Sequence, residues 1–106
     1  MSYTSRTLNS SAGQVERWQP SPHILVQRMG DEIVLFHRRT SLFYKLNRTG
    51  ARFWDLLVSG HAMASIGEQL FEQFDVDADQ LKGEIESTLE LLMTESLISA
   101  VEEEQA

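Results

Sequence analysis

The stretch LFYKLNRTGARFWDLL, residues 42–57, carries the signals of a strand that passes directly into a helix. Leu42, Tyr44 and Leu46 alternate with the side chains between them, and aromatic residues suit a half-buried, pleated strand. Asn47 follows, and an asparagine can cap a helix because its side chain accepts a hydrogen bond from an otherwise unpaired backbone N–H. We therefore expect a strand, a cap and a helix in direct succession.

The helix predicted after this cap has Phe53, Leu56 and Leu57 at helical spacing, with Trp54 beside them. Gly50 lies in its first turn, although a glycine inside a helix costs about 1 kcal/mol relative to alanine. A close backbone approach at Gly50 would explain why glycine stands there.

Length and composition predict one soluble domain. The chain has 106 residues and no cysteine, which allows a hydrophobic core and excludes disulfides and thiolate metal sites. No apolar run approaches the ~20 residues that span a bilayer, and no signal-like segment opens the sequence. We expect a cytoplasmic protein without membrane contacts.

The charge is divided unequally along the chain. Up to Trp54, eight basic residues stand against three acidic ones, a net charge of +5. From Asp55 onward, Lys82 is the one base among thirteen acids, a net charge of −12. Such asymmetry favours recognition of a partner over chemistry, although solvated helix faces also produce runs of acids.

The beginning of the chain has the composition of a tail. Residues 1–22 are mostly polar, and Pro20 and Pro22 close the segment. Trp18 is the exception, because a large aromatic side chain can dock onto the domain or onto a partner. We expect a flexible tail over residues 1–22, with Trp18 at most packed on the surface.

Two strands are predicted between this tail and the central stretch. Residues 23–28 and 32–37 have β-type patterns, and Gly30-Asp31 between them supplies turn chemistry. Together with residues 42–46 they predict a three-stranded antiparallel meander, joined by short turns.

Two further helices are predicted after the central stretch. The start of the second helix is open, because Ser65 and Glu68 form a capping-box pattern whereas Met63 already fits the helical period. Asp77 or Asp79 can cap the third helix, which is expected to end near residue 95. The apolar faces are formed by Met63, Ile66, Leu70, Phe71 and Phe74 in the second helix and by Leu81, Ile85, Leu89, Leu92 and Met93 in the third.

This order of three strands and three helices, with YKLNRTGARFW at the junction, resembles the PqqD-like family of peptide-recognition domains. The family serves ribosomally synthesised and post-translationally modified peptides (RiPPs). The matching features are Tyr44, Leu46, Asn47, Thr49, Gly50, Trp54 and the FDVD turn at residues 74–77. The resemblance covers about residues 23–99. The sequence departs from the family pattern at Ala62, a position where a Thr or Ser often caps the second helix.

The resemblance implies a non-catalytic α+β domain of winged-helix-like architecture, in which a three-stranded antiparallel sheet is followed by three helices. Residues 23–99 would form this domain, and residues 100–106 an acidic C-terminal tail. Such domains bind the leader segment of a precursor peptide by β-strand addition, without a cofactor. They present the peptide to a modifying enzyme, such as a radical SAM maturase or a leader peptidase. Whether the chain forms a homodimer stays open.

In the family, the leader lies beside the third strand, in a groove that this strand shares with the third helix. Carried over to this sequence, the candidate peptide-binding residues are Arg39, Leu42, Phe43, Tyr44, Lys45, Lys82, Ile85, Glu86 and Leu89. Some of them have a simpler explanation, since Ile85 and Leu89 fit an ordinary helix core and Tyr44 fits a side chain that faces the helices. Phe43 and Lys45 alternate to the opposite face of the strand.

Catalysis and metal binding find little support in the sequence. His23, His37 and His61 lie in separate segments without metal-ligand spacing, and no Gly-rich phosphate loop is present. The acids of the third helix are typical of a solvated face. We expect no catalytic residue, no metal site and no cofactor.

A winged-helix DNA-binding regulator is the main alternative, because it shares the architecture. A helix that enters a DNA groove needs Lys and Arg for the phosphates, whereas the third helix has Lys82 alone among its acids. The basic residues around the third strand are Arg38, Arg39, Lys45, Arg48 and Arg52. They suit an acidic peptide equally well, so we expect no nucleic-acid binding. A generic adaptor subunit of an enzyme complex is a third possibility that overlaps with the first.

Overall fold

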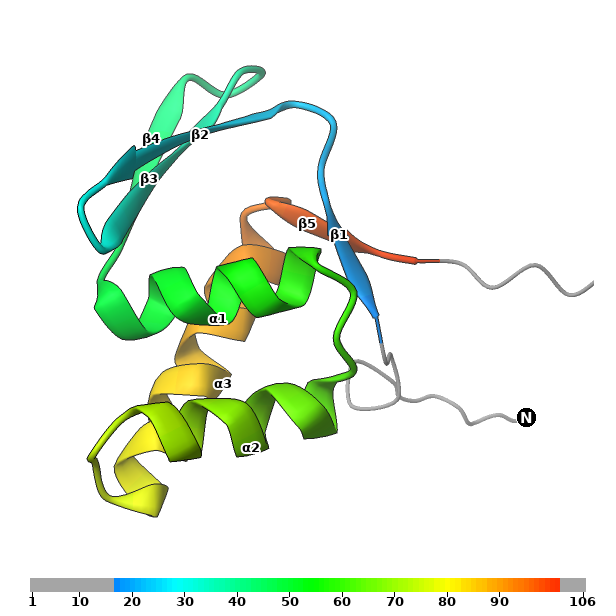
Figure 1. The fold of residues 1–106 in the computed structure, drawn as a ribbon. Helices are drawn as coiled ribbons and strands as arrows, with labels where there is room; N and C mark the ends of the chain where they lie inside the picture. The colour runs from blue at the N-terminus through cyan, green and yellow to red at the C-terminus, as the bar shows by residue number, and fades with distance from the viewer. Residues whose placement is uncertain (1–16, 102–106) are drawn as a thin grey trace, which may run out of the picture.

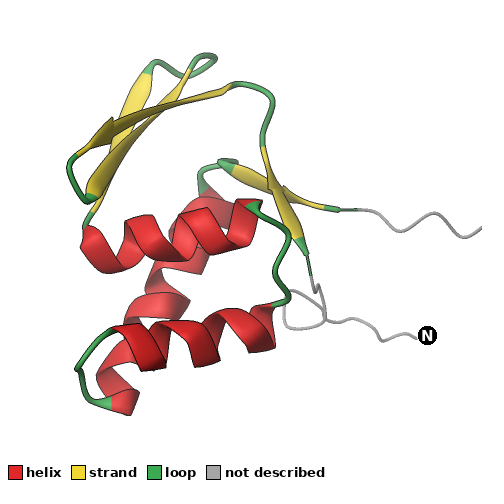
Figure 2. Cartoon of the chain, viewed as in Figure 1, coloured by secondary structure: helices red, strands yellow, loops and turns green. Residues whose placement is uncertain are grey.

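The computed structural model describes residues 17–101, which form two small sheets and three helices (Figures 1 and 2). In chain order the elements are β1 (Trp18–Pro20), β2 (Ile24–Met29), β3 (Glu32–His37), β4 (Leu42–Leu46), α1 (Arg48–Val58), α2 (Met63–Gln73), α3 (Ala78–Thr94) and β5 (Ile98–Ala100). Residues 1–16 and 102–106, which include most of the two predicted tails, lie outside the described part.

The three-stranded sheet is an antiparallel meander in the order β2-β3-β4, as the sequence predicts. Gly30, with a φ of 67°, lies in the turn between β2 and β3. On β3, Ile33 and Leu35 are fully buried and alternate with half-buried residues on the other face. The sheet therefore has one face on the helices and one toward solvent, and β4 is an edge strand.

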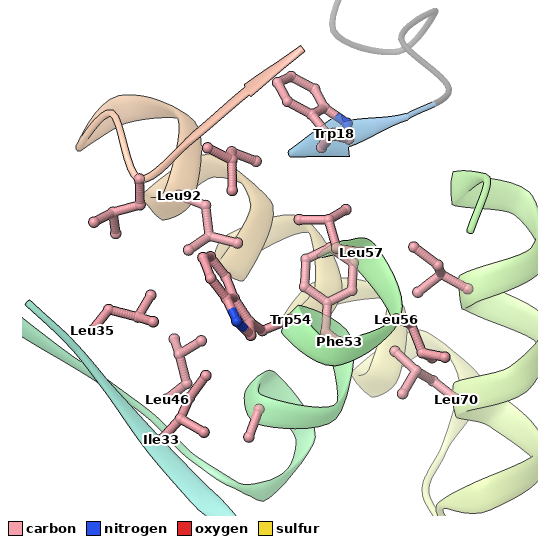
Figure 3. Packing of buried hydrophobic residues seen from close by; sticks show 14 of the residues in the cluster. Trp18, Ile33, Leu35, Leu46, Phe53, Trp54, Leu56, Leu57, Leu70 and Leu92 are labelled. Carbon is pink, nitrogen blue, oxygen red and sulfur yellow. The ribbon is translucent and has the colours of Figure 1, made fainter. Parts of the chain in front are cut away.

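The second sheet departs from the expected boundaries of the domain. β1 pairs antiparallel with β5, and Trp18 lies opposite Ala100. Trp18 is 7% exposed and belongs to the core cluster (Figure 3), so residues 18–20 belong to the fold, not to a flexible tail. Three residues are too few to show an alternating pattern, and their partner strand is distant in sequence. For these two reasons the sheet could not be predicted from the sequence.

The start of α1 confirms the predicted cap. The Asn47 Oδ1 accepts a hydrogen bond of 2.9 Å from the Gly50 backbone N–H. A Cβ on Gly50 would lie 3.3 Å from the Leu46 Cβ and 3.4 Å from the Asn47 Oδ1. The atoms closest to this glycine are therefore side-chain atoms of Leu46 and Asn47, and not backbone atoms of another segment.

The other two helices begin at two of the positions left open by the sequence. α2 begins at Met63, and Ala62 at its N-cap makes no side-chain hydrogen bond to the helix, so the Ser65 capping-box alternative is wrong. At α3 the Asp77 carboxylate accepts hydrogen bonds from the backbone N–H groups of Asp79 and Gln80. Asp77 is therefore the cap, and its negative charge also favours the positive end of the helix dipole.

α1 lies at the centre of the molecule, between the three-stranded sheet and α2 (Figure 1). It contacts β1, β3, β4, α2 and α3, and the buried side chains of Phe53, Trp54 and Leu57 fill the space between them (Figure 3). The sheet and α2 therefore lie on opposite sides of α1. α3 passes behind α1 and reaches from α2 toward the sheet.

Candidate functional site

Within residues 17–101, β4 pairs with β3 alone, and its free edge presents backbone groups from alternate residues. The backbone N–H of Arg38, just after β3, donates a hydrogen bond to the carbonyl of His23, just before β2. Because the hydrogen-bonding direction alternates along a strand, Ile33, Leu35 and His37 of β3 direct their backbone groups to β4 instead. Those residues pair with Leu42, Tyr44 and Leu46. The backbone N–H and C=O groups of Phe43 and Lys45 must then point away from β3, toward the open edge.

The side chains of β4 divide between the two faces of the sheet. Leu42, Tyr44 and Leu46 alternate onto the face that packs on the helices, where Leu46 is buried and Tyr44 is half-buried against the core. The predicted orientation of Tyr44 is confirmed. Leu42, on the same face, remains 51% exposed. An apolar side chain is thus available beside the open edge on the helix side.

Phe43 and Lys45 lie on the outer face, as their alternation predicts. Phe43 is 70% exposed, and its ring centroid is 4.7 Å from that of Phe36 on β3. The Lys45 Nζ is 3.1 Å from a carboxylate oxygen of Glu32. These two side chains therefore do not face the helices, and an added strand would meet them on its own outer side.

α3 and β4 meet through a hydrogen bond between Tyr44 and Glu95. The Tyr44 hydroxyl donates to the Glu95 carboxylate at 2.7 Å. This hydrogen bond, followed by desolvation, raises the pKa of the Tyr44 phenol above its usual value, because a neighbouring carboxylate disfavours the phenolate. Leu91 and Thr88, four and seven positions before Glu95, share its face of the helix and are half-buried.

The predicted helix residues lie elsewhere on α3. Lys82, Ile85 and Glu86 line a pocket together with Phe71 of α2, and no β4 residue takes part in that pocket. Leu89 is half-buried against the core. Ile85 and Leu89 belong to the apolar stripe of α3, which packs against the core as the simpler explanation expected. The residue at the end of α3 that contacts β4 is Glu95, which the sequence argument did not name; Leu91 and Thr88 precede it at helical spacing.

Arg39 lies in a polar pocket beyond the start of β4. The pocket has a volume of about 430 Å³ and is lined by His23, His37, Arg39 and Glu95 among others. The two imidazole rings stack with centroids 6.2 Å apart, and the Arg39 backbone N–H donates to His37 Nδ1 at 3.2 Å. Because Glu95 also holds Tyr44, this pocket continues directly from the contact between β4 and α3.

The five basic residues predicted around the strand do not form one patch. Arg48 stacks on the Phe74 ring at 4.7 Å, and Arg52 donates a 2.9 Å hydrogen bond to Gln73. Both line a polar pocket of about 290 Å³ near the end of α2. Arg38, Arg39 and Lys45 remain near β4 itself.

Two further sequence expectations concern metals and membranes. Within residues 17–101, no group of three or more His, Asp or Glu side chains is arranged to hold a metal ion. No helix in the same part of the chain is both long and apolar enough to cross a membrane.

The sequence matches a known family model over residues 32–98, which is described as Coenzyme PQQ synthesis protein D (PqqD). The chain belongs to the PqqD family. The resemblance seen in the strand–cap–helix stretch is thereby confirmed, and the PqqD match spans β3, β4 and all three helices. No curated protein sequence matches the chain.

Two solved structures share the fold of this PqqD-family chain. One, "TbiB1 in Complex with the TbiA(beta) Leader Peptide", is 24% identical, with a TM-score of 0.69, and the match covers 80% of this chain and 99% of that one. The other, "Lasso peptide synthetase B1 complexed with the leader peptide", is 22% identical, with a TM-score of 0.69, and the match covers 78% and 98% of the two chains. The three-stranded sheet with three helices is thus an architecture found in proteins that bind leader peptides.

Proposed function

We propose that this PqqD-family chain binds the leader segment of a ribosomally made precursor peptide along the free edge of β4, and that it does so without catalysing a reaction. The open edge, where Phe43 and Lys45 direct their backbone groups to solvent, is the observation that carries the proposal. Both structures that share the fold hold a leader peptide, which supports the same function here.

The proposed binding mode uses both the backbone groups and the side chains of β4. Main-chain hydrogen bonds to Phe43 and Lys45 would give affinity without regard to sequence, as in other cases of strand addition. Alternate side chains of the bound peptide would enter the groove on the helix side, next to Leu42 and Tyr44. Leu91 on α3 would form the opposite wall. Apolar anchors in this groove would provide the larger part of the selectivity.

The helix half of the site differs from the one the sequence suggested. Glu95 contacts Tyr44 of β4, and Leu91 and Thr88 precede it at helical spacing, so we propose these residues for the groove in preference to Lys82 and Glu86. Arg39 would lie near one end of the bound peptide, in the pocket that adjoins Glu95.

The bound peptide would be presented to a modifying enzyme, such as a radical SAM maturase or a leader peptidase, that carries the catalytic groups. The acidic third helix argues against the DNA-binding alternative. From Ala78 to Thr94 its one base is Lys82, and a helix of that charge would repel phosphates. A salt-sensitive complex with random duplex DNA, seen by fluorescence anisotropy, would contradict this reasoning.

The test compares two substitutions at Lys45. Lys45→Pro removes the backbone donor that faces the open edge, whereas Lys45→Ala keeps the donor and loses the same charged side chain. The probe is a fluorescent leader peptide from a precursor gene that neighbours the gene of this chain. We expect Lys45→Pro to weaken binding by about tenfold, since it removes one hydrogen bond and strains the strand, and Lys45→Ala to change it little.

Circular dichroism and thermal unfolding establish that the proline variant still folds. Tyr44→Pro provides the opposite control, because its N–H points to β3 and its loss should disrupt the sheet itself. Equal peptide affinity of a folded Lys45→Pro variant and of Lys45→Ala would show that the peptide does not bind along this edge.

A further inference from the structure

The pocket between α2 and α3 has no role in the proposed peptide groove. Its volume is about 470 Å³, within the range of about 300–1,000 Å³ that is usual for binding pockets. α2 and the first half of α3 lie on the side of α1 opposite the three-stranded sheet (Figure 1). A peptide on β4 would therefore leave this pocket open.

The lining of the pocket is mainly apolar. Leu81 is buried, Ile85 is half-buried, and Gly67 leaves space because no atom lies within 4 Å of where its Cβ would be. Phe71 stands at the side of the pocket and is 53% exposed. A half-exposed phenylalanine next to an apolar hollow favours contact with a large apolar side chain from another molecule.

The surface around the pocket is strongly acidic. Residues 63–94 contain eight acids and a single base, Lys82, and Glu68 and Glu86 are part of the pocket itself. The ion pairs found among residues 17–101 involve none of these eight acids. Their charges are thus uncompensated within the described part of the chain, and a partner with a basic surface would be attracted to them.

We propose that the α2–α3 pocket is the docking site of a partner protein that inserts an apolar side chain from a basic segment. The apolar lining selects the anchor, and the acidic surroundings select the charge of the residues that flank it. A symmetric contact between two copies of this chain would instead place two acidic surfaces against each other.

The experiment uses two synthetic amphipathic peptides with the same leucine pattern, one with lysine and one with glutamate at the polar positions. Binding to the full-length, 15N-labelled chain is followed by amide chemical shifts. We expect the lysine peptide to shift the signals of Gly67, Phe71 and Ile85, and the glutamate peptide to bind at least about tenfold more weakly, because of its charge.

Phe71→Ser should weaken binding of the lysine peptide by about tenfold or more, which corresponds to about 1.4 kcal/mol. The matched control is Leu25→Ser, which removes an apolar side chain of nearly the same exposed fraction (52% against 53% for Phe71) from β2 and should leave binding unchanged. Both variants alter exposed side chains, so both should fold.

Five outcomes would overturn the proposal. Shifts centred on the sheet, equal binding of the glutamate peptide, or unchanged binding by Phe71→Ser would each show that the pocket does not select a basic, apolar segment. Concentration-dependent shifts of the pocket signals in the free chain would show that a second copy of the chain occupies the pocket. Contacts of residues 1–16 with Phe71 would show that the chain's own N-terminal residues occupy it. None of these results depends on whether a leader peptide binds to β4.

Discussion

Replacing Trp18 tests whether β1 is a structural part of the domain. Trp18 is 7% exposed and packs in the core cluster, although it lies close to the beginning of the described chain. Truncating a buried tryptophan to alanine typically costs about 3–5 kcal/mol, because apolar contacts are lost and a cavity remains. Trp18→Ala should therefore remove a large share of the roughly 5–15 kcal/mol that keeps a small domain folded.

A second feature of Trp18 refines the expected magnitude. Its indole Nε1 is buried without a hydrogen-bond partner among residues 17–101, and an unpaired buried donor costs about 1–3 kcal/mol. Alanine removes this cost along with the ring, so the loss for Trp18→Ala should lie near the lower end, about 3 kcal/mol. Phenylalanine keeps most of the packing and also removes the unpaired donor, so Trp18→Phe should change stability by about 1 kcal/mol or less.

Urea unfolding provides the measurement, since the fluorescence of Trp54, buried in the core, reports unfolding in both variants. The alanine variant should lose about 3 kcal/mol at an unchanged m-value, which corresponds to roughly 4–8 °C in Tm per kcal/mol for a domain of this size. An alanine variant within about 1 kcal/mol of the parent would refute the reasoning, because β1 would then be a loosely attached end. Equal losses for alanine and phenylalanine would refute the packing role assigned to the aromatic ring, since both variants remove the unpaired N–H.

Two further predictions concern β4. In a Tyr3→Phe background, the phenolate absorbance reports Tyr44 alone and should show a pKa above the usual value of about 10. Glu95→Gln should lower that pKa. An unchanged Tyr44 pKa in Glu95→Gln would exclude the Tyr44–Glu95 hydrogen bond in solution. Because the pKa is raised in the folded chain, the stabilisation from this bond is present below pH ~10 and is lost as the pH rises through the folded value. Changing Arg38 and Arg39 to serine should slow the association of an acidic leader peptide in stopped flow at low salt and have little effect at high salt, since exposed charges are screened beyond ~10 Å at 0.1 M. Unaltered association at low salt would mean that these arginines are merely solvated turn residues.

The junction of β4 and α1 could be predicted because each of its signals is local. Asn47 and Gly50 are three positions apart, and their hydrogen bond closes within one helical turn. The alternation of Leu42 and Tyr44 is likewise visible within five residues, and it placed Phe43 correctly on the outer face. Features that depend on neighbouring residues could therefore be predicted from the sequence alone.

Features that depend on distant partners were not accessible. β1 has three residues, and nothing in them indicates that residues 98–100 would pair with them. For α3, the sequence showed an apolar stripe but not which flank of the stripe would meet β4. The Tyr44–Glu95 hydrogen bond brings the end of α3 to β4, and it joins residues 51 positions apart. The sequence thus predicted the two faces of β4, but it did not show that Lys82 and Glu86 line a pocket with α2.

The position of α3 suggests how one small domain could hold a peptide and a partner protein at the same time. Its last turns meet β4 through Glu95, whereas its first turns form the acidic pocket with Phe71 of α2. The two regions share a helix but no residue, so occupation of one would leave the contacts of the other intact. If both proposals hold, Phe71→Ser should weaken binding of the partner and spare the peptide, and Lys45→Pro should weaken binding of the peptide and spare the partner. Independence of this kind is what a non-catalytic presenting domain requires, because the partner can then be recruited by free and peptide-bound chains alike, and only the bound chains deliver a substrate.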